Sequence, residues 1–549
     1  MKTSLVASGL AAAVAVSAAA GAMAAPAPPP SDALLLKEGV RAVVQVTAMD
    51  LDVVATKDGL LVRDLRKEDL KVSVNGKAVA IDFFSRVDEG TLHGPDLATA
   101  SPDMILQTIQ GEEGDRFVPR QFLLLFDDLH LLPQERPRIV EAFRDFVTRM
   151  APSDRMSIVS LGTTTRVMVP FTSSKETLLD GLTRLEKVAP PGFMWDLQYR
   201  QQVQDLRRTP GSAARSGMIR TWAEQVRARE DGTLQELQRA VSALAGRSGK
   251  RILLLVSRGF ELQPGQTLTQ SLAPGLQQFD YSVRGAFQKV LDEANRGGVT
   301  IHALDGRGLV AEGDASESSP PLRSTFFETE ARREALSGLA EGTGGTLVFE
   351  RNVLAPSLDR IYRESGSYYL VGVTLGSLDP KKAPYDLKVT TTRPGVKLAA
   401  RKSYAPMSAD DASRDRVEMA LMNPDASGDF PISLQVGASS KGGAPGRRLS
   451  PFTVRFPVGA LTFAETEGLR KTTVEISIAA VEDNGARSGI TATRVPISIP
   501  EASMERAEKD GFAYTGEMKS RTGNFRFVAT VRDLASGRTG IASASVRVP

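Results

Sequence analysis

The sequence predicts an α/β fold: a doubly wound, mostly parallel sheet, preceded by a small β module and followed by an all-β, sandwich-like domain. Between residues 120 and about 375, apolar strand-like runs alternate with helical patterns, which is typical of a parallel sheet covered by helices. On both sides of this region the pattern is β only, with short alternating runs separated by turn residues. A chain of 549 residues is long enough for several such domains.

The N-terminal residues 1–24 have the pattern of a signal peptide. Lys2 is followed by an apolar run and by the small-residue site Ala22-Met23-Ala24. A Pro-rich linker, 25–37, comes next. We therefore expect an exported protein, periplasmic or extracellular, with no stable membrane insertion after signal cleavage. An uncleaved anchor is the alternative, but the Ala-rich run and the prolines directly after it favour cleavage.

Composition limits the possible function classes. The net charge of +3 is too balanced to predict nucleic-acid binding. The chain has no cysteine, which excludes disulfides and thiolate metal sites, and its three histidines are His93, His130 and His302. His302 lies inside a strand pattern and is most simply a core or edge histidine.

Residues 38–90 predict a small β module. Asp58-Gly59 stands at a turn between two strand-like runs, and Asn75-Gly76 stands at a hairpin turn whose two central residues need positive φ angles. The polar segment 91–118 then reads as a linker.

Residues 119–408 form the predicted α/β domain. Its first strand, Phe122 to Phe126, is a continuous apolar run, as expected for a strand buried on both faces. The helix after it has apolar residues at helical spacing, and Ser173-Ser174-Lys175-Glu176 is a helix-capping pattern. Residues 409–549 contain short alternating strands with turns between them, which predicts a β-sandwich-like domain.

A helical insert at 188–231 interrupts the alternation of strands and helices. It contains both tryptophans, Trp195 and Trp222, and seven arginines, among them Arg207, Arg208 and Arg220. Tryptophan and arginine are enriched at binding hot spots, so these five residues are a candidate docking surface for a partner. A solvated helix face is the alternative interpretation of the arginines.

The sequence contains no complete enzyme or cofactor-binding motif of the kinds considered below. GRSGKR at 246–251 and GTGGT at 342–346 come after a helix and before a strand, whereas nucleotide-binding glycine loops follow a strand. No Gly-x-Ser-x-Gly or His-Glu-x-x-His pattern occurs. We expect no catalytic residue, cofactor or metal ligand.

Several phrases, in this order, resemble von Willebrand factor A-like domains of exported acidobacterial proteins: DDLHL, SRGFEL, LDGRGL, LAEGTGGTL and YYLVGVTL. The resemblance extends over roughly residues 40–405. It implies a doubly wound sheet and a role in protein recognition. It also implies where a metal-ion-dependent adhesion site would lie, namely at Asp127 and Asp128 after the first strand.

This chain departs from that metal-site pattern. The family pattern is Asp-x-Ser-x-Ser, but Leu129 and Leu131 stand where the serines should be, and Arg258 stands at a later aspartate position. A guanidinium could take the charge role of the cation by pairing with Asp127 or Asp128. The resemblance therefore implies a degenerate metal site.

The candidate interaction face at this end of the sheet comprises Asp127, Asp128, His130, Arg258 and Asp305, although Asp305 is also explained as a turn residue. We expect an exported, non-enzymatic interaction protein of the adhesion or scaffold type, with a protein partner and no nucleic acid. A metal-dependent adhesin using Asp127 and Asp128 is the main alternative. A periplasmic hydrolase is a weaker one.

Overall fold

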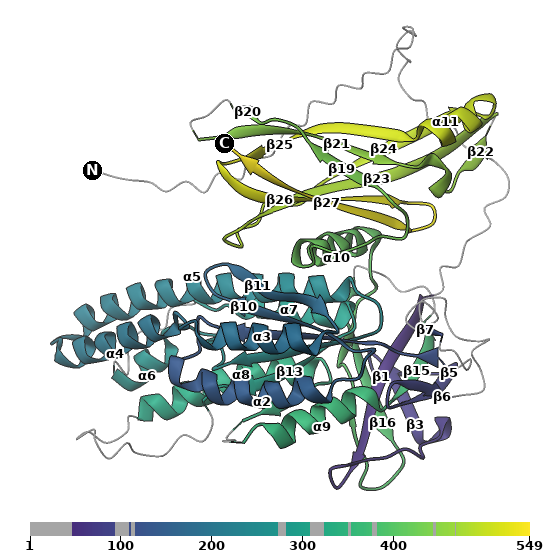
Figure 1. The fold of residues 1–549 in the computed structure, drawn as a ribbon. Helices are drawn as coiled ribbons and strands as arrows, with labels where there is room; N and C mark the ends of the chain where they lie inside the picture. The colour runs from purple at the N-terminus through teal and green to yellow at the C-terminus, as the bar shows by residue number, and fades with distance from the viewer. Residues whose placement is uncertain are drawn as a thin grey trace. The chain divides into compact units, whose positions relative to one another are not determined.

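The computed structural model describes residues 47–93, 109–110, 116–272, 281–307, 323–349, 353–375, 382–442, 446–466 and 468–549. The expected signal peptide and Pro-rich linker lie outside these residues. The chain divides into two compact units, Val44–Asn423 and a second unit that contains Pro424–Pro549. Figure 1 gives the element labels used below. Among the described residues, no helix is long and apolar enough to cross a membrane.

The first unit contains a six-stranded sheet in the order β11-β10-β9-β12-β13-β14. Only β11 is antiparallel to its neighbour; the other strands run parallel. The bounds are β9 Arg120–Asp127, β10 Arg155–Leu161, β11 Thr165–Thr172, β12 Lys250–Ser257, β13 Val299–Asp305 and β14 Leu347–Val348. All eight residues of β9 are buried, which explains its unbroken apolar run. The expected mixed α/β fold with a largely parallel sheet is confirmed.

Helices pack on both faces of this sheet because successive side chains of a strand point to opposite faces. Phe122, Leu124 and Phe126 of β9 share one core with α2, α3 and α9, whereas Leu123 and Leu125 share another with α5, α7 and α8. These helices are α2 Arg136–Arg149, α3 Lys175–Glu186, α5 Ser212–Ala245, α7 Arg284–Arg296, α8 Arg323–Gly342 and α9 Ala355–Gly366. Two further helices are α4 Gly192–Arg208 and α6 Gln266–Leu272.

The β part of the first unit is not a module of N-terminal strands alone. β1, Thr47–Lys57, pairs with β15, Tyr368–Leu375, and β3, Leu70–Val74, pairs with β16, Tyr385–Thr391. The expectation of a separate module at 38–90 is therefore wrong, because its strands share sheets and a core with strands that follow the α/β region.

The remaining strands of this part are β2 Leu60–Leu61, β4 Lys77–Val79, β5 Phe83–Asp88, β6 Thr91–His93, β7 Ile109–Gln110, β8 Arg116–Phe117, β17 Lys397–Ala399 and β18 Ser403–Tyr404. Three of these strands, β6, β7 and β8, lie in the segment expected to be a linker.

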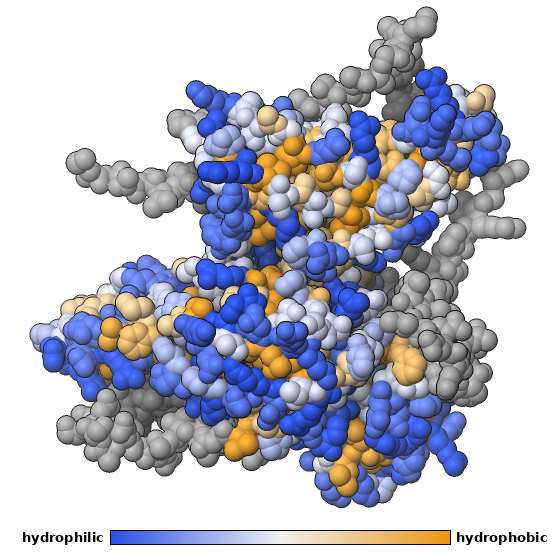
Figure 2. Space-filling view, in the orientation of Figure 1, coloured by the Kyte–Doolittle hydropathy of each residue, from blue (hydrophilic) through white to orange (hydrophobic). Residues whose placement is uncertain are grey.

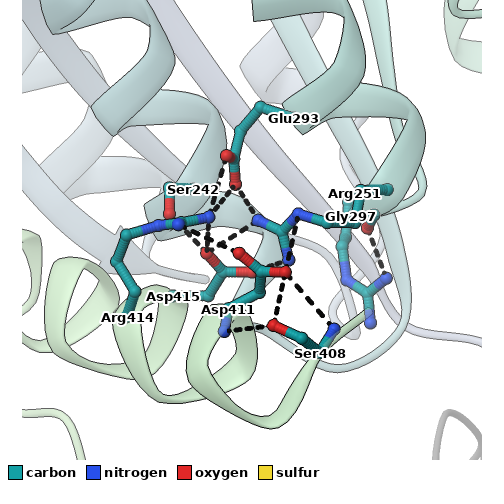
Figure 3. Close-up of polar contacts among 9 residues, drawn as sticks. Ser242, Arg251, Glu293, Gly297, Ser408, Asp411, Arg414 and Asp415 are labelled. Carbon is teal, nitrogen blue, oxygen red and sulfur yellow. Dashed lines mark hydrogen bonds and ion pairs between the residues drawn. The ribbon is translucent and has the colours of Figure 1, made fainter. Parts of the chain in front are cut away.

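Helix α10, Ala409–Met422, is the last element of the first unit. Figure 3 shows its side chains Arg414 and Asp415 in polar contact with Glu293 and Ser242. Asp415 of this helix accepts a hydrogen bond from Ser242 of α5 and pairs with Arg296 of α7 at 3.2 Å. Residue 409 was the expected start of the all-β domain, and that boundary is wrong, because α10 packs on α5 and the division falls after Asn423.

The second unit consists of two antiparallel sheets whose inward side chains share one core. The first sheet contains β19 Ser433–Val436, β20 Ser440–Lys441, β21 Arg448–Phe456 and β25 Phe512–Ser520. The second contains β22 Ala464–Thr466, β23 Leu469–Glu482, β24 Thr491–Pro500, β26 Gly523–Asp533 and β27 Thr539–Val548. A short helix, α11 Met504–Asp510, precedes β25.

Candidate functional site

The carboxyl ends of the parallel strands meet at one edge of the six-stranded sheet. From β9 the chain passes to β10 on one side and later returns to β12 on the other, so this edge contains the point where the strand order reverses. Open α/β sheets bind ligands at such a point. Asp127 ends β9, Ser257 ends β12 and Asp305 ends β13, beside Ser257 in register.

Three fully buried side chains form the centre of the site. The Nδ1 of His130 lies 2.8 Å from Oδ2 of Asp127, and its Nε2 lies 2.9 Å from Oε2 of Glu230 in α5. Ser257 donates a hydrogen bond of 2.6 Å to the same oxygen of Asp127. Arg229 donates to Glu230 at 2.6 Å.

These contacts determine the charge of the imidazole. Both ring nitrogens face carboxylates, so both must carry a proton to donate. Burial lowers the pKa of His130, but the carboxylates of Asp127 and Glu230 outweigh burial and hold this pKa above its usual value. Burial likewise raises the pKa of Glu230, and His130 and Arg229 reverse that effect and lower it. The centre is an imidazolium between two carboxylates.

Asp128 has a separate cation. Its Oδ1 pairs with the buried guanidinium of Arg136, at the start of α2, and its Oδ2 accepts a hydrogen bond of 2.5 Å from Ser160. Arg136 also donates to the carbonyls of Leu185 and Val188. Burial raises the pKa of Asp128 to about 6, and Arg136 opposes this rise.

The expectation that Arg258 pairs with Asp127 or Asp128 is wrong. Arg258 lies 3.5 Å from Glu135 and 3.7 Å from Asp196, and Arg136 takes the position opposite Asp128. The reason is the chain path, because α2 begins eight residues after Asp128 and its first residue, Arg136, reaches that carboxylate.

Asp305 lies at the same edge with its own partners. Its carboxylate accepts three hydrogen bonds from the guanidinium of Arg307, at 2.8, 3.2 and 2.7 Å, and one from the backbone N–H of Arg307 at 3.0 Å. Arg333 adds a weaker pair at 3.7 Å. Asp305 therefore caps a turn, and its charge is compensated within the protein.

We call Asp127, Asp128, His130, Arg136, Glu230 and Ser257 the carboxyl-edge network. These residues do not fit a metal-ion-dependent adhesion site. Leu129 and Leu131, at the two serine positions, are packed into the cores on opposite faces of the sheet. Of the carboxylate oxygens on Asp127, Oδ2 is already shared by two donors, and buried Oδ1 has no hydrogen-bond partner. Within the described ranges, no group of three or more His, Asp or Glu side chains is placed to hold a metal ion.

The network also lacks the order of a hydrolase triad. Ser257 donates to a carboxylate, not to His130, and His130 has no free nitrogen to accept a proton. His302 has a structural role: its Nδ1 accepts the backbone N–H of Thr346, and burial lowers its pKa to about 3.

The apolar side chains of the predicted insert form a small cluster of their own with Leu268 of α6. Trp222 is buried against Trp195, with ring centroids 6.0 Å apart, and Arg229 lies over the Trp195 ring. α5 continues without a break from Ser212 to Ala245 and carries Glu230 into the network. The expectation that both tryptophans lie on a docking surface is therefore wrong, because Trp222 is buried.

The exposed side chains of the insert are arginines and apolar residues of α4. Arg207, Arg208 and Arg220 are exposed, as expected of a docking or solvated face. On α4, Phe193 and Leu197 are 51% and 52% exposed, and Figure 2 shows apolar surface where α4 lies.

Sequence reasoning missed three members of the network. Glu230 lies 100 residues from His130 and was counted with the insert. Arg136 reads as an ordinary charge in the first turn of a helix, and Ser257 as the end of a strand. The signal in the sequence was the polar residues at the ends of apolar strands, which indicated the site but not its partners.

No protein-family model and no curated protein matches the chain. Solved structures that are similar include an aerotolerance-related membrane protein from Bacteroides fragilis (11% identity, 45% of this chain and 98% of that chain, TM-score 0.23). Proximal thread matrix protein 1 from the mussel byssus has 10% identity over 47% of this chain and 48% of its own, with a TM-score of 0.25. The PilB minor pilin of Streptococcus sanguinis has 10% identity over 60% and 80%, with a TM-score of 0.26. At these values the likenesses assign no function.

Proposed function

We propose that the protein is an exported, non-enzymatic interaction protein of the adhesion or scaffold type. Its α/β domain would be a doubly wound, von Willebrand factor A-like domain of the kind found in exported acidobacterial proteins, with a degenerate metal site. The observation that carries this proposal is the carboxyl-edge network, in which protein cations neutralise the carboxylates where such domains hold an ion.

Burial of the network supports the non-enzymatic part of the proposal. Asp127, His130 and Glu230 have no exposed side-chain surface, so a substrate has no access to their reactive atoms without opening the fold. The network is then a scaffold that holds the surrounding loops rigid. Rigid loops around a sheet edge present a preformed surface. Less conformational entropy is then lost when a protein binds.

The experiment that tests the proposal is partner capture with and without divalent cations. The immobilised protein is incubated with extract of the native cell envelope in buffer containing Mg²⁺, or in the same buffer with EDTA. We expect the same partner, identified by mass spectrometry, in both. Capture that disappears in EDTA would favour the metal-dependent adhesin, the alternative in which Asp127 and Asp128 bind an ion.

Asp127→Asn provides the matched control. If an ion at Asp127 mediated capture, this variant would behave in Mg²⁺ as the unchanged protein does in EDTA. Under our proposal the variant keeps whatever capture its folded fraction allows, and EDTA does not alter it.

A further inference from the structure

The β part of the first unit contains a cavity that the carboxyl-edge network does not use. It is open to solvent, has a volume of about 650 Å³, and is lined by four cationic side chains and one carboxylate. These are Lys57, Arg63, Arg86, Arg393 and Asp64. A hollow lined mainly by one sign of charge concentrates its field and attracts ions of the opposite sign.

Two of the four cations already have carboxylate partners. Arg393 pairs with Asp64 at 3.0 Å and with Asp69 at 3.7 Å, and Arg63 pairs with Asp88 at 3.4 Å. The charges of Arg393 and Arg63 are therefore compensated within the protein.

The other two cations have none. Among the described residues, Lys57 and Arg86 form no ion pair. Arg86 donates one hydrogen bond of 2.7 Å, to the carbonyl of Arg63, and its Nε is buried without a hydrogen-bond partner. A guanidinium offers a planar pair of donors that matches a carboxylate, and a lysine beside it adds a point charge. The cavity therefore has two uncompensated positive charges.

The rest of the lining is apolar. Leu61, Val62, Pro394 and Val396 share the cavity with the cations, and Leu60, beside Leu61 in β2, is 71% exposed. A bare inorganic anion would leave this apolar surface in water. A ligand that covers both kinds of surface carries an apolar group next to its negative charges.

We propose that this cavity binds an acidic segment of a partner polypeptide, with carboxylates at Lys57 and Arg86 and an apolar side chain against Leu61 and Val62. The inference rests on the proposed function in taking the partner to be a protein. Charge complementarity selects the occupant, since two unpaired cations flank an apolar surface within one cavity.

The test is calorimetric titration of the purified protein with the synthetic peptide acetyl-Glu-Leu-Glu-amide. The matched neutral peptide is acetyl-Gln-Leu-Gln-amide. We expect the acidic peptide to bind at least about tenfold more tightly, with an affinity that falls as salt is added. Equal binding of the two peptides would overturn the proposal.

Variants then locate the site. Lys57→Gln combined with Arg86→Gln removes both unpaired charges, and we expect a loss of about tenfold or more in affinity. Arg86→Lys keeps the charge but loses the planar donors, so its loss should be smaller. Lys71→Gln removes an exposed cation of β3 that lies outside the cavity and forms no ion pair with any described residue, so it should leave binding unchanged. Unchanged binding by the double variant, with an unchanged melting temperature, would contradict the site.

Inorganic phosphate is the last probe. Phosphate that binds as tightly as the acidic peptide would assign the cavity to phosphate-bearing ligands and overturn the peptide assignment. The peptide test and the partner-capture test are independent because the peptide is synthetic. If the acidic peptide does not bind, the cavity is excluded as a docking point, but the result of partner capture in Mg²⁺ and EDTA still stands. If partner capture fails, peptide binding can still be measured.

Discussion

The carboxyl-edge network and the cation-lined cavity are two groups of charges in the same unit, and they differ in how the charges are satisfied. In the network, Asp127, His130 and Glu230 are sealed from solvent, and every carboxylate faces a cation. In the cavity, Lys57 and Arg86 form no ion pair with any residue that the structure describes. Charges compensated inside a fold stabilise it or hold its shape, whereas uncompensated charges at a hollow surface are available to a ligand.

The strongest test of this contrast is His130→Leu. The change leaves the buried carboxylates of Asp127 and Glu230 without their shared cation, and we expect a loss of about 3 to 5 kcal/mol in the free energy of unfolding. Urea unfolding followed by tryptophan fluorescence measures it, because both tryptophans lie in the first unit. Arg86→Gln is the matched change in the cavity and should cost less than about 0.5 kcal/mol. Similar losses of unfolding free energy for both variants would show that the network and the cavity do not differ in this way.

The second test separates two arginines at the same edge of the sheet. Arg136→Met removes a buried guanidinium from Asp128 and should cost about 2 to 4 kcal/mol. Arg258→Met removes a side chain that is 24% exposed and whose pairs are 3.5 and 3.7 Å long, so we expect about 1 kcal/mol or less. A larger loss for Arg258 would restore the assignment that the sequence suggested.

Features formed by neighbouring residues could be predicted from the sequence, whereas contacts between residues far apart in the chain could not. The apolar run of β9 and its ending at Asp127 were predicted correctly, and so were two tight turns. Asn75 and Gly76 have φ angles of 47° and 76°, as an Asn-Gly hairpin turn requires. Local patterns of this kind fix backbone geometry within a few residues. They located the edge of the sheet where the network lies.

The partners within the network could not be predicted in this way. Nothing local marks Glu230 as the partner of His130, since a glutamate on a long helix is usually exposed. The same limit explains the β module, because β1 pairs with β15 across the whole α/β region. Pairing between distant segments depends on the tertiary fold. A single sequence does not show which distant segments come together.

A third prediction concerns pH. Burial raises the pKa of Asp128 to about 6, above its unfolded value of 3.8, so its contribution to stability is present below pH 3.8 and is lost as pH rises to about 6. Asp128→Asn has no such titration. The variant should therefore gain stability relative to the unchanged protein as pH rises from 3.8 to 6, measured by urea unfolding at each pH. A constant difference would mean that folding does not shift the pKa of Asp128.

His130 gives a second pH window. Its folded pKa lies above 6.5, so its contribution is complete below pH 6.5 and is lost as pH rises through the folded value. Stability of the first unit should fall on the alkaline side of 6.5. Stability that rises there would contradict an imidazolium between two carboxylates.

The smallest expected effect is that of divalent metal ions on the melting temperature. If His130 and Arg136 compensate Asp127 and Asp128, millimolar Mg²⁺, Mn²⁺ or Ca²⁺ should leave the melting temperature of the first unit unchanged. An ion bound there at a hundredfold excess over its dissociation constant would add about 2.7 kcal/mol, or several degrees. A rise that Asp127→Asn abolishes would show a working metal site. Arg136→Met sharpens the result, because it frees Asp128: a metal-dependent rise in this variant alone would identify the guanidinium as the group that excludes the ion.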